Sequence, residues 1–111
     1  MIIRSVRIEF EAKLAAADAH RATGKIECKA YGDGERALRA RLRDLDDVAP
    51  DCSLRLFVND RMIGDLQRTR NKAELKLDSR LRDAVPNVSA GDQAEIRCGE
   101  LIVSRGRFYE D

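Results

Sequence analysis

The chain has 111 residues, of which 43% are hydrophobic and 37% are charged. Its 21 Lys and Arg residues against 20 Asp and Glu residues give a formal net charge of +1, which argues against a protein that binds polyanions through overall charge, although a local basic patch stays open. This length predicts a single domain over residues 1–111 with one core, built mainly from aliphatic side chains because aromatic residues make up only 5%.

The N-terminal residues and the cysteines indicate the cellular compartment in which the protein is expected. Residues 1–4 do not begin an apolar run of signal-peptide length, and no later stretch has the length of a membrane span, so the chain as written is expected to be cytoplasmic. If the sequence is a piece of a longer secreted chain, export is the alternative. Three cysteines without short-range pairing argue against a disulfide framework.

The first half of the chain alternates apolar and polar residues with a period of two, which is typical of strands with one buried face. The pattern predicts strands at residues 5–14, 25–30 and 38–43. Residues 15–21 are rich in alanine but too short for a stable isolated helix, so we expect a loop with at most one turn. Residues 44–51 are rich in turn-forming residues and predict a loop.

Residues 53–78 predict three successive strands joined by two tight connections, and the rest of the chain is organised around them. Asn59 and Asp60 suit a two-residue hairpin turn, since both residue types tolerate positive φ. Such a turn predicts a register that places the following residues opposite one another: Val58 and Arg61, Phe57 and Met62, Leu56 and Ile63. Residues 68–72 then form a polar connection to a strand at 73–78.

The last third of the chain predicts a long connection and a second hairpin. Residues 79–92 show no sustained period, so we expect a crossover between sheet layers that Val85 and Val88 fix to the core. Residues 94–98 and 101–103 flank Gly99, which suits a type II′ turn, and residues 105–109 can extend the second strand. The fold class is therefore all-β with little helix, a small antiparallel sandwich or partly open barrel of about eight short strands.

Several segments together resemble a small all-β module of uncharacterised bacterial proteins, over roughly residues 23 to 108. They are Phe57-Val58-Asn59-Asp60 with Ile63-Gly64, residues 73–79, Val85-Pro86 with Val88, and Gly91-Asp92 with Ala94-Glu95-Ile96. The resemblance implies this fold and a non-catalytic role, and many such modules belong to exported or surface-associated chains. Asn-Gly is frequent in such modules where this chain has Asn59-Asp60.

Catalytic and zinc-binding residues are sparse. His20 is the only histidine, and no nucleophile motif accompanies it, so a surface histidine is the favoured interpretation. Cys28, Cys52, Cys98 and His20 could together hold zinc, but they lack the closely spaced ligand pairs of structural zinc sites. Cys28 and Cys98 fall at inward strand positions, where a free cysteine acts as a small hydrophobe. We expect no cofactor and no metal.

The loop at residues 44–51 concentrates carboxylates that could bind calcium. Asp44, Asp46, Asp47 and Asp51 supply hard oxygen ligands, but their spacing lacks the EF-hand pattern and its glycine. Arg41 and Arg43 can neutralise the cluster without a metal. A solvated turn is the favoured interpretation.

Two rows of basic residues are the positive evidence for a nucleic-acid- or phosphate-binding module. The first row lies along one predicted strand and consists of Arg39, Arg41 and Arg43. The second row lies in one connection and consists of Arg68, Arg70 and Lys72. Both rows could follow a phosphate backbone. Exposed aromatic residues for stacking on bases are missing, however, so a solvated strand face balanced by acids is favoured.

The predicted hairpin carries apolar residues on both faces. If Leu56, Val58 and Ile63 face the core, then Phe57, Met62 and Leu66 point outward and need a cover. Either a loop of the same chain or a second copy could supply it, and a symmetric homodimer is slightly favoured. The sequence therefore predicts a non-catalytic structural or protein-interaction module, with nucleic-acid binding as the alternative and an enzyme of unknown class as a distant one.

Overall fold

Alternating apolar and polar residues form antiparallel strands along most of the chain, as the sequence predicts. A computed structural model describes residues 5–17 and 20–111, so the expectations for residues 1–4 and for part of the 15–21 loop lie outside the described residues. The described residues form these elements: β1 (Val6–Ala16), β2 (Thr23–Tyr31), β3 (Arg36–Arg43), β4 (Leu54–Val58), β5 (Arg61–Asp65), β6 (Gln67–Thr69), β7 (Lys72–Asp78), the 3₁₀ helix η1 (Ser79–Leu81), β8 (Gln93–Cys98) and β9 (Leu101–Glu110). In the part of the chain that the structure describes, no helix has the length and apolarity that a membrane crossing requires.

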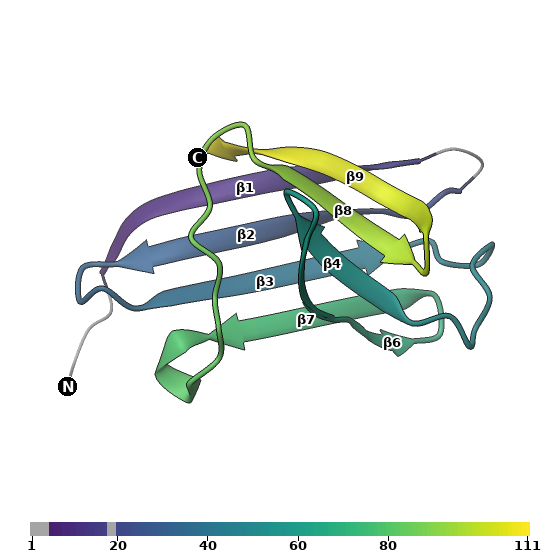
Figure 1. Ribbon diagram of the computed structural model, residues 1–111, viewed down its shortest axis with the longest axis horizontal. Helices are drawn as coiled ribbons and strands as arrows, with labels where there is room; N and C mark the ends of the chain where they lie inside the picture. The colour runs from purple at the N-terminus through teal and green to yellow at the C-terminus, as the bar shows by residue number, and fades with distance from the viewer. Residues whose placement is uncertain (1–4, 18–19) are drawn as a thin grey trace.

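The strands form one sheet that nearly closes into a barrel. Their order is β5-β4-β8-β9-β1-β2-β3-β7-β6, with every pair antiparallel. In Figure 1 the strands β4, β8 and β9 cross in front of β1, β2, β3 and β7. The two strands at the ends of the order, β5 and β6, are consecutive in the chain and separated only by Leu66. The chain thus connects the two edges of the sheet, and the all-β fold class is confirmed.

The hairpin between β4 and β5 has the predicted turn but a different register beyond it. Asn59 and Asp60 adopt φ angles of 50° and 66°, as a type I′ turn requires, and Phe57 lies opposite Met62. Leu56, however, lies opposite Gly64 instead of Ile63, because the ladder has an irregularity between Leu56 and Phe57. The prediction for this pair was wrong, since a bulge adds one residue to one strand and the sequence pattern does not show it.

The added residue reverses the orientation of Leu66. Its backbone N–H donates to the carbonyl of Leu54 at 2.8 Å, and its side chain is only 7% exposed, within the core. Leu66 therefore does not share the outward face with Phe57 and Met62, which corrects the sequence-based expectation. Beyond Leu66 the expected polar connection is shorter than predicted, since β6 pairs with β7 and the turn between Thr69 and Lys72 has two residues.

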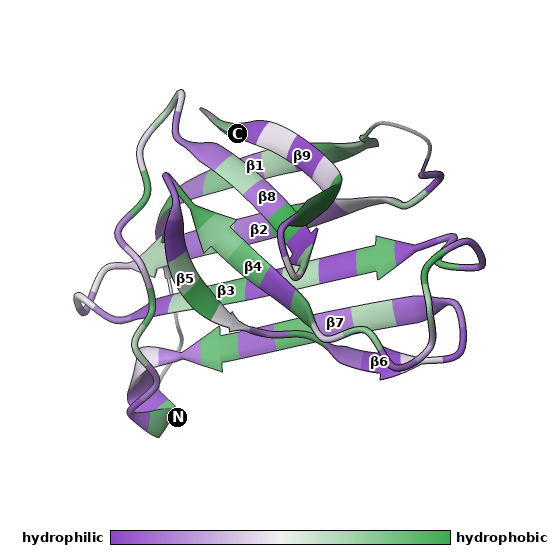
Figure 2. Ribbon diagram, turned by 45° about the vertical axis from the view of Figure 1, so that its right-hand side comes forward, coloured by the Kyte–Doolittle hydropathy of each residue, from purple (hydrophilic) through white to green (hydrophobic). Residues whose placement is uncertain are grey.

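Small aliphatic side chains fill the interior. Figure 2 shows hydrophobic and hydrophilic residues alternating along the strands. The inward positions of β2 and β3 carry Ile26, Leu38 and Ala40, which are almost completely buried, and Phe108 from β9 is the large aromatic residue among the fully buried side chains. This agrees with a core expected to depend on aliphatic residues.

Two glycines allow neighbouring strands to approach closely. A Cβ atom at Gly24 in β2 would overlap the backbone carbonyl of Arg41 in β3, and one at Gly106 in β9 would overlap the carbonyl of Lys13 in β1. Glycine within a strand commonly marks such an approach or a bend in the sheet. Both positions help the long strands to curve around the core.

Two irregular segments lie at opposite ends of β3 and pack onto the core. Residues 79–92 cross from β7 to β8 as predicted, and both Val85 and Val88 are buried. Figure 1 shows this segment running from η1 across the molecule to the start of β8. The loop between β3 and β4 carries Leu45 and Val48, which are also buried. Each segment therefore extends the core beyond the strands.

The structure contradicts the expectation that the cysteines stay unpaired. Cys52 and Cys98 form a disulfide with a Cα–Cα distance of 5.8 Å, across 46 positions in the sequence. Because β4 pairs with β8 and Leu54 lies opposite Cys98, the fold brings together two residues that have no short-range relation. Cys28 remains a free, buried thiol. Spacing alone did not reveal this long-range pair.

The disulfide predicts a measurable contribution to stability. Closing a loop of 46 residues restricts the unfolded chain enough to stabilise the folded state by about 4 kcal/mol in the chain-entropy model. We expect Cys52→Ser with Cys98→Ser to lower the free energy of urea unfolding by about this amount, and reduction of the wild type to do the same. Equal unfolding midpoints for oxidised and reduced protein would contradict the pairing.

Candidate interaction surfaces

The first basic row lies on the outer face of β3, where each arginine has an acidic neighbour. Arg39 donates from Nε to Oε2 of Glu74 at 2.8 Å, and Arg41 Nη2 lies 3.3 Å from Oε1 of Glu27. Arg43 is more exposed and lies 3.9 Å from the carboxylate of Asp44. The structure thus places the three arginines on one face, where cross-strand acids engage Arg39 and Arg41 and the adjacent Asp44 lies near Arg43.

These ion pairs shift the protonation of their members. Hydrogen bonding from Arg39 lowers the pKa of Glu74 below its ordinary value. Burial is the largest single influence on Glu27 and raises its pKa. The charge and hydrogen bond of Lys25, together with the charges of Lys29 and Arg41, nevertheless make the net shift of the pKa downward. The charge of Glu27 in turn raises the pKa of Lys25. Both carboxylates therefore stay ionised at neutral pH and partly neutralise the basic row.

The second basic row does not form one surface, because Arg68 binds backbone carbonyls. Its guanidinium donates to the carbonyl oxygens of Leu45, Val48 and Ala49 at 2.9 Å, and to that of Arg70 at 2.8 Å. Arg68 is therefore engaged by the chain itself, which the sequence pattern did not indicate. Arg70 and Lys72 remain exposed around the β6–β7 turn.

The same contacts organise the loop at residues 44–51, whose carboxylates were candidates for calcium. The guanidinium of Arg68 supplies the cation toward which the loop carbonyls point, while Asp44, Asp46 and Asp47 are exposed. Among the described residues, no group of three His, Cys, Asp or Glu side chains is arranged to hold a metal ion. The loop is organised by a protein cation, and two of its carboxylates, Asp44 and Asp47, lie near Arg43 and His20.

The residues considered for zinc binding and for catalysis are dispersed. Cys52 and Cys98 are joined to each other, whereas Cys28 is buried and donates weakly to the carbonyl of Pro86 at 3.9 Å. Burial raises the pKa of the Cys28 thiol to about 11, so the free thiol stays protonated at neutral pH. His20 Nδ1 lies 4.0 Å from a carboxylate oxygen of Asp47.

The outer face of β4, β5 and β8 combines apolar and charged groups, and we call it the hairpin face. It consists of Phe57, Met62, Asp60, Glu95 and Arg97. Met62 is 52% exposed, while Phe57 is half-buried beneath the guanidinium of Arg97, which lies 4.1 Å from the ring centre. Such a cation over an aromatic ring is attractive. An arginine from a neighbouring strand therefore covers Phe57, a contact that the sequence pattern does not indicate.

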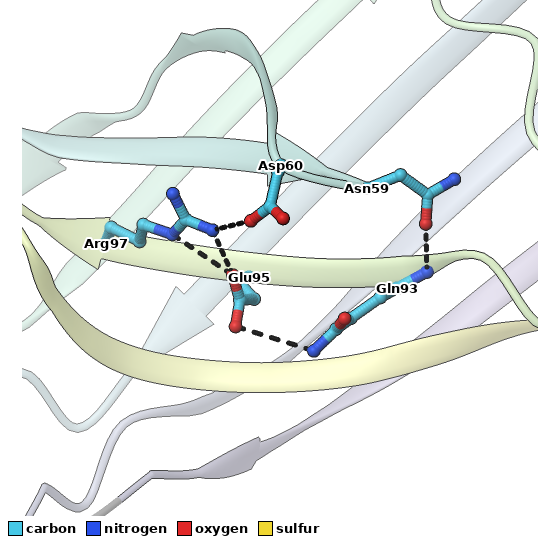
Figure 3. A network of polar contacts seen from close by, with 5 residues as sticks. All are labelled: Asn59, Asp60, Gln93, Glu95 and Arg97. Carbon is cyan, nitrogen blue, oxygen red and sulfur yellow. Dashed lines mark hydrogen bonds and ion pairs between the residues drawn. The ribbon is translucent and has the colours of Figure 1, made fainter.

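Arg97 is fixed in place by two carboxylates. Its guanidinium donates to Glu95, which is buried, and to Asp60 at the tip of the hairpin (Figure 3). The hydrogen bonds that Arg97 donates to Glu95 and to Asp60 raise its pKa. The polar side chains at alternate positions of β8 were visible in the sequence, but their contact with Phe57 depends on the long-range pairing of β4 with β8.

The turn is also attached to β8 by Asn59. Its side-chain oxygen accepts a hydrogen bond from the backbone N–H of Gln93 at 2.9 Å (Figure 3). Its own backbone N–H donates to the Gln93 carbonyl at 2.9 Å. Asp60, at the position where glycine is common in such turns, uses its carboxylate to bind Arg97. The hairpin face is therefore held by side chains as well as by the strand ladder.

No protein-family model matches the chain, and no curated protein matches it. Its surfaces are therefore interpreted from their own geometry.

Arg68 provides a direct test of the loop architecture. We expect Arg68→Ala to lower the free energy of unfolding by about 2 kcal/mol, because it removes charge-assisted hydrogen bonds and leaves several carbonyls without this donor. Arg70→Ala, at the neighbouring exposed position, is the control and should change stability by less than about 0.5 kcal/mol. Chemical denaturation of both variants measures the difference, and equal losses would contradict the role of Arg68.

Proposed function

We propose that this protein is a non-catalytic interaction module that binds a protein partner through the hairpin face. The observation that carries the proposal is the exposed side chain of Met62 beside Phe57, whose ring lies beneath Arg97. Aromatic residues and arginine dominate the energetics of many protein interfaces, and methionine adapts to varied partner shapes. The face thus combines apolar contact area with groups that can hydrogen-bond.

The fixed geometry of this face favours binding. Arg97 is held by Glu95 and Asp60 in the free protein, so little side-chain freedom is lost when a partner covers it. Asp60 is largely exposed and Arg97 is one-fifth exposed, so the face offers both signs of charge at its edge. A rigid surface of this composition suits a protein partner.

We favour a second copy of the chain as the partner. A twofold axis through the hairpin face would place Met62 of each copy against the hairpin face of the other copy. The two copies would then use the same surface for the contact. Because Arg97 already covers Phe57, the apolar surface left for the second copy centres on Met62. Both signs of charge on the face permit Asp60 and Arg97 to form contacts across such an axis.

The alternatives have less support. The acidic neighbours of Arg39 and Arg41, and the carbonyl contacts of Arg68, leave fewer free cations for a phosphate backbone than the basic rows suggested. For catalysis, the described polar contact of the His20 side chain is with Asp47, which supplies no nucleophile.

The disulfide supports an oxidising compartment as the place of action. Structural disulfides persist in secreted, periplasmic and surface proteins and are rare in reducing cytosol. The Cys52–Cys98 pair therefore favours the exported alternative over the cytoplasmic expectation.

The homodimer is tested by replacing Met62. We expect the wild type to sediment as a dimer at micromolar concentration, and Met62→Asp to weaken the dimer at least about tenfold by placing a charge in an apolar contact. Leu81→Asp is the matched control, because Leu81 is 75% exposed in η1, outside the hairpin face, and its replacement should leave the dimer intact. A wild type that remains monomeric at millimolar concentration would refute the homodimer.

A further inference from the structure

A second surface of distinct chemistry lies on the outer side of β2, β3, β6 and β7. A hollow of about 620 Å³ opens there. Six of the residues that line it carry basic or neutral polar side chains: Lys25, Arg41, Arg43, Lys72, Gln67 and Thr69. We call this surface the basic hollow. It brings members of both basic rows together with Lys25, which the sequence analysis did not include.

Cations outnumber carboxylates among the residues that line the basic hollow. Four basic side chains line it, and Glu74 is the carboxylate among its lining residues. Glu74 is itself engaged by Arg39 at 2.8 Å and by Lys76 at 3.7 Å, neither of which lines the hollow. Arg39 and Lys76 thus offset the charge of Glu74, so those cations of the hollow that carboxylates engage least can attract anions in spite of the near-neutral charge of the whole chain.

Its cations differ in how far they are already neutralised, and Lys25 is the most engaged, since its Nζ lies 3.5 Å from Glu11 and 3.4 Å from Glu27. Among the described residues, Lys72 has no ion-pair partner, and Arg43 lies 3.9 Å from Asp44. Arg41 uses one guanidinium nitrogen to contact Glu27 at 3.3 Å, so its other N–H donors remain available to a ligand. Arg43 and Lys72 are thus the cations most available to a ligand.

The spacing of the arginines matches an extended peptide. Arg41 and Arg43 are two positions apart on β3, so their Cα atoms are about 7 Å apart on one face. Carboxylates at alternate positions of an extended chain have the same spacing, and arginine binds carboxylate through paired hydrogen bonds. We propose that the basic hollow binds an acidic, extended segment of a partner protein.

A nucleic acid fits this surface less well. Among its described lining residues there is no aromatic side chain on which a base could stack. The basic track is also short, because Arg39, the next arginine along β3, is engaged by Glu74. A peptide with a few alternating carboxylates needs only the cations that the hollow provides. This surface is separate from the hairpin face, so either proposal can fail without the other.

The test uses a fluorescein-labelled peptide of six residues in which aspartate alternates with threonine. Binding is measured by fluorescence anisotropy at about 50 mM salt, where screening of exposed charges is weak. We expect saturable binding to the wild type, and a rise in Kd of roughly fivefold or more for Arg43→Gln with Lys72→Gln, since charged contacts are lost.

A charge-matched control separates the site from net charge. Arg61→Gln with Arg105→Gln removes two exposed cations of β5 and β9, and it should change Kd by less than about twofold. Thermal unfolding checks that both double variants are folded. Absence of saturable binding at millimolar peptide, equal losses in the two double variants, or tighter binding of an oligothymidine of equal charge would each overturn the proposal.

Discussion

The structure depends on one strand segment that changes its pairing partner in the middle. Residues 61–65 pair with β4, residues 67–69 pair with β7, and Leu66 lies between them with its N–H bonded to Leu54. This change joins the two ends of the strand order, so the sheet surrounds a core instead of remaining open. A nearly closed sheet leaves few unpaired edges and buries one face of every strand. Arg68, two residues farther on, then binds the β3–β4 loop at one end of β3.

The two proposed surfaces follow from that arrangement. The bulge near Leu56 directs Leu66 inward and leaves Phe57 and Met62 outside, where Arg97 from β8 covers the aromatic ring. On the other side, the return of the chain as β6 places Gln67 and Thr69 beside the basic side chains of β2 and β3. The hairpin face is apolar with a rigid charged network, and the basic hollow is cationic. They suit partners of different chemistry.

Sequence patterns predicted the fold well because alternation records which face of a strand is buried. It predicted the strands other than β6, the turn at Asn59 and Asp60, and the crossover fixed by Val85 and Val88. It failed where the outcome depends on contacts between distant residues, as with the Cys52–Cys98 disulfide. The contacts of Arg68 and Arg97 were missed for the same reason. The sequence does not distinguish an arginine that faces solvent from one that donates hydrogen bonds to other residues of the same chain.

The closure at Leu66 is tested most directly by native-state hydrogen exchange, followed residue by residue with NMR. If the segment joins the two edges, the Leu66 amide is protected by its 2.8 Å bond to Leu54 within the core. Its opening free energy should then approach that of the Ala40 amide in β3, a strand paired on both sides. Exchange of Leu66 as fast as that of the exposed Arg70 amide would show that the sheet is open there.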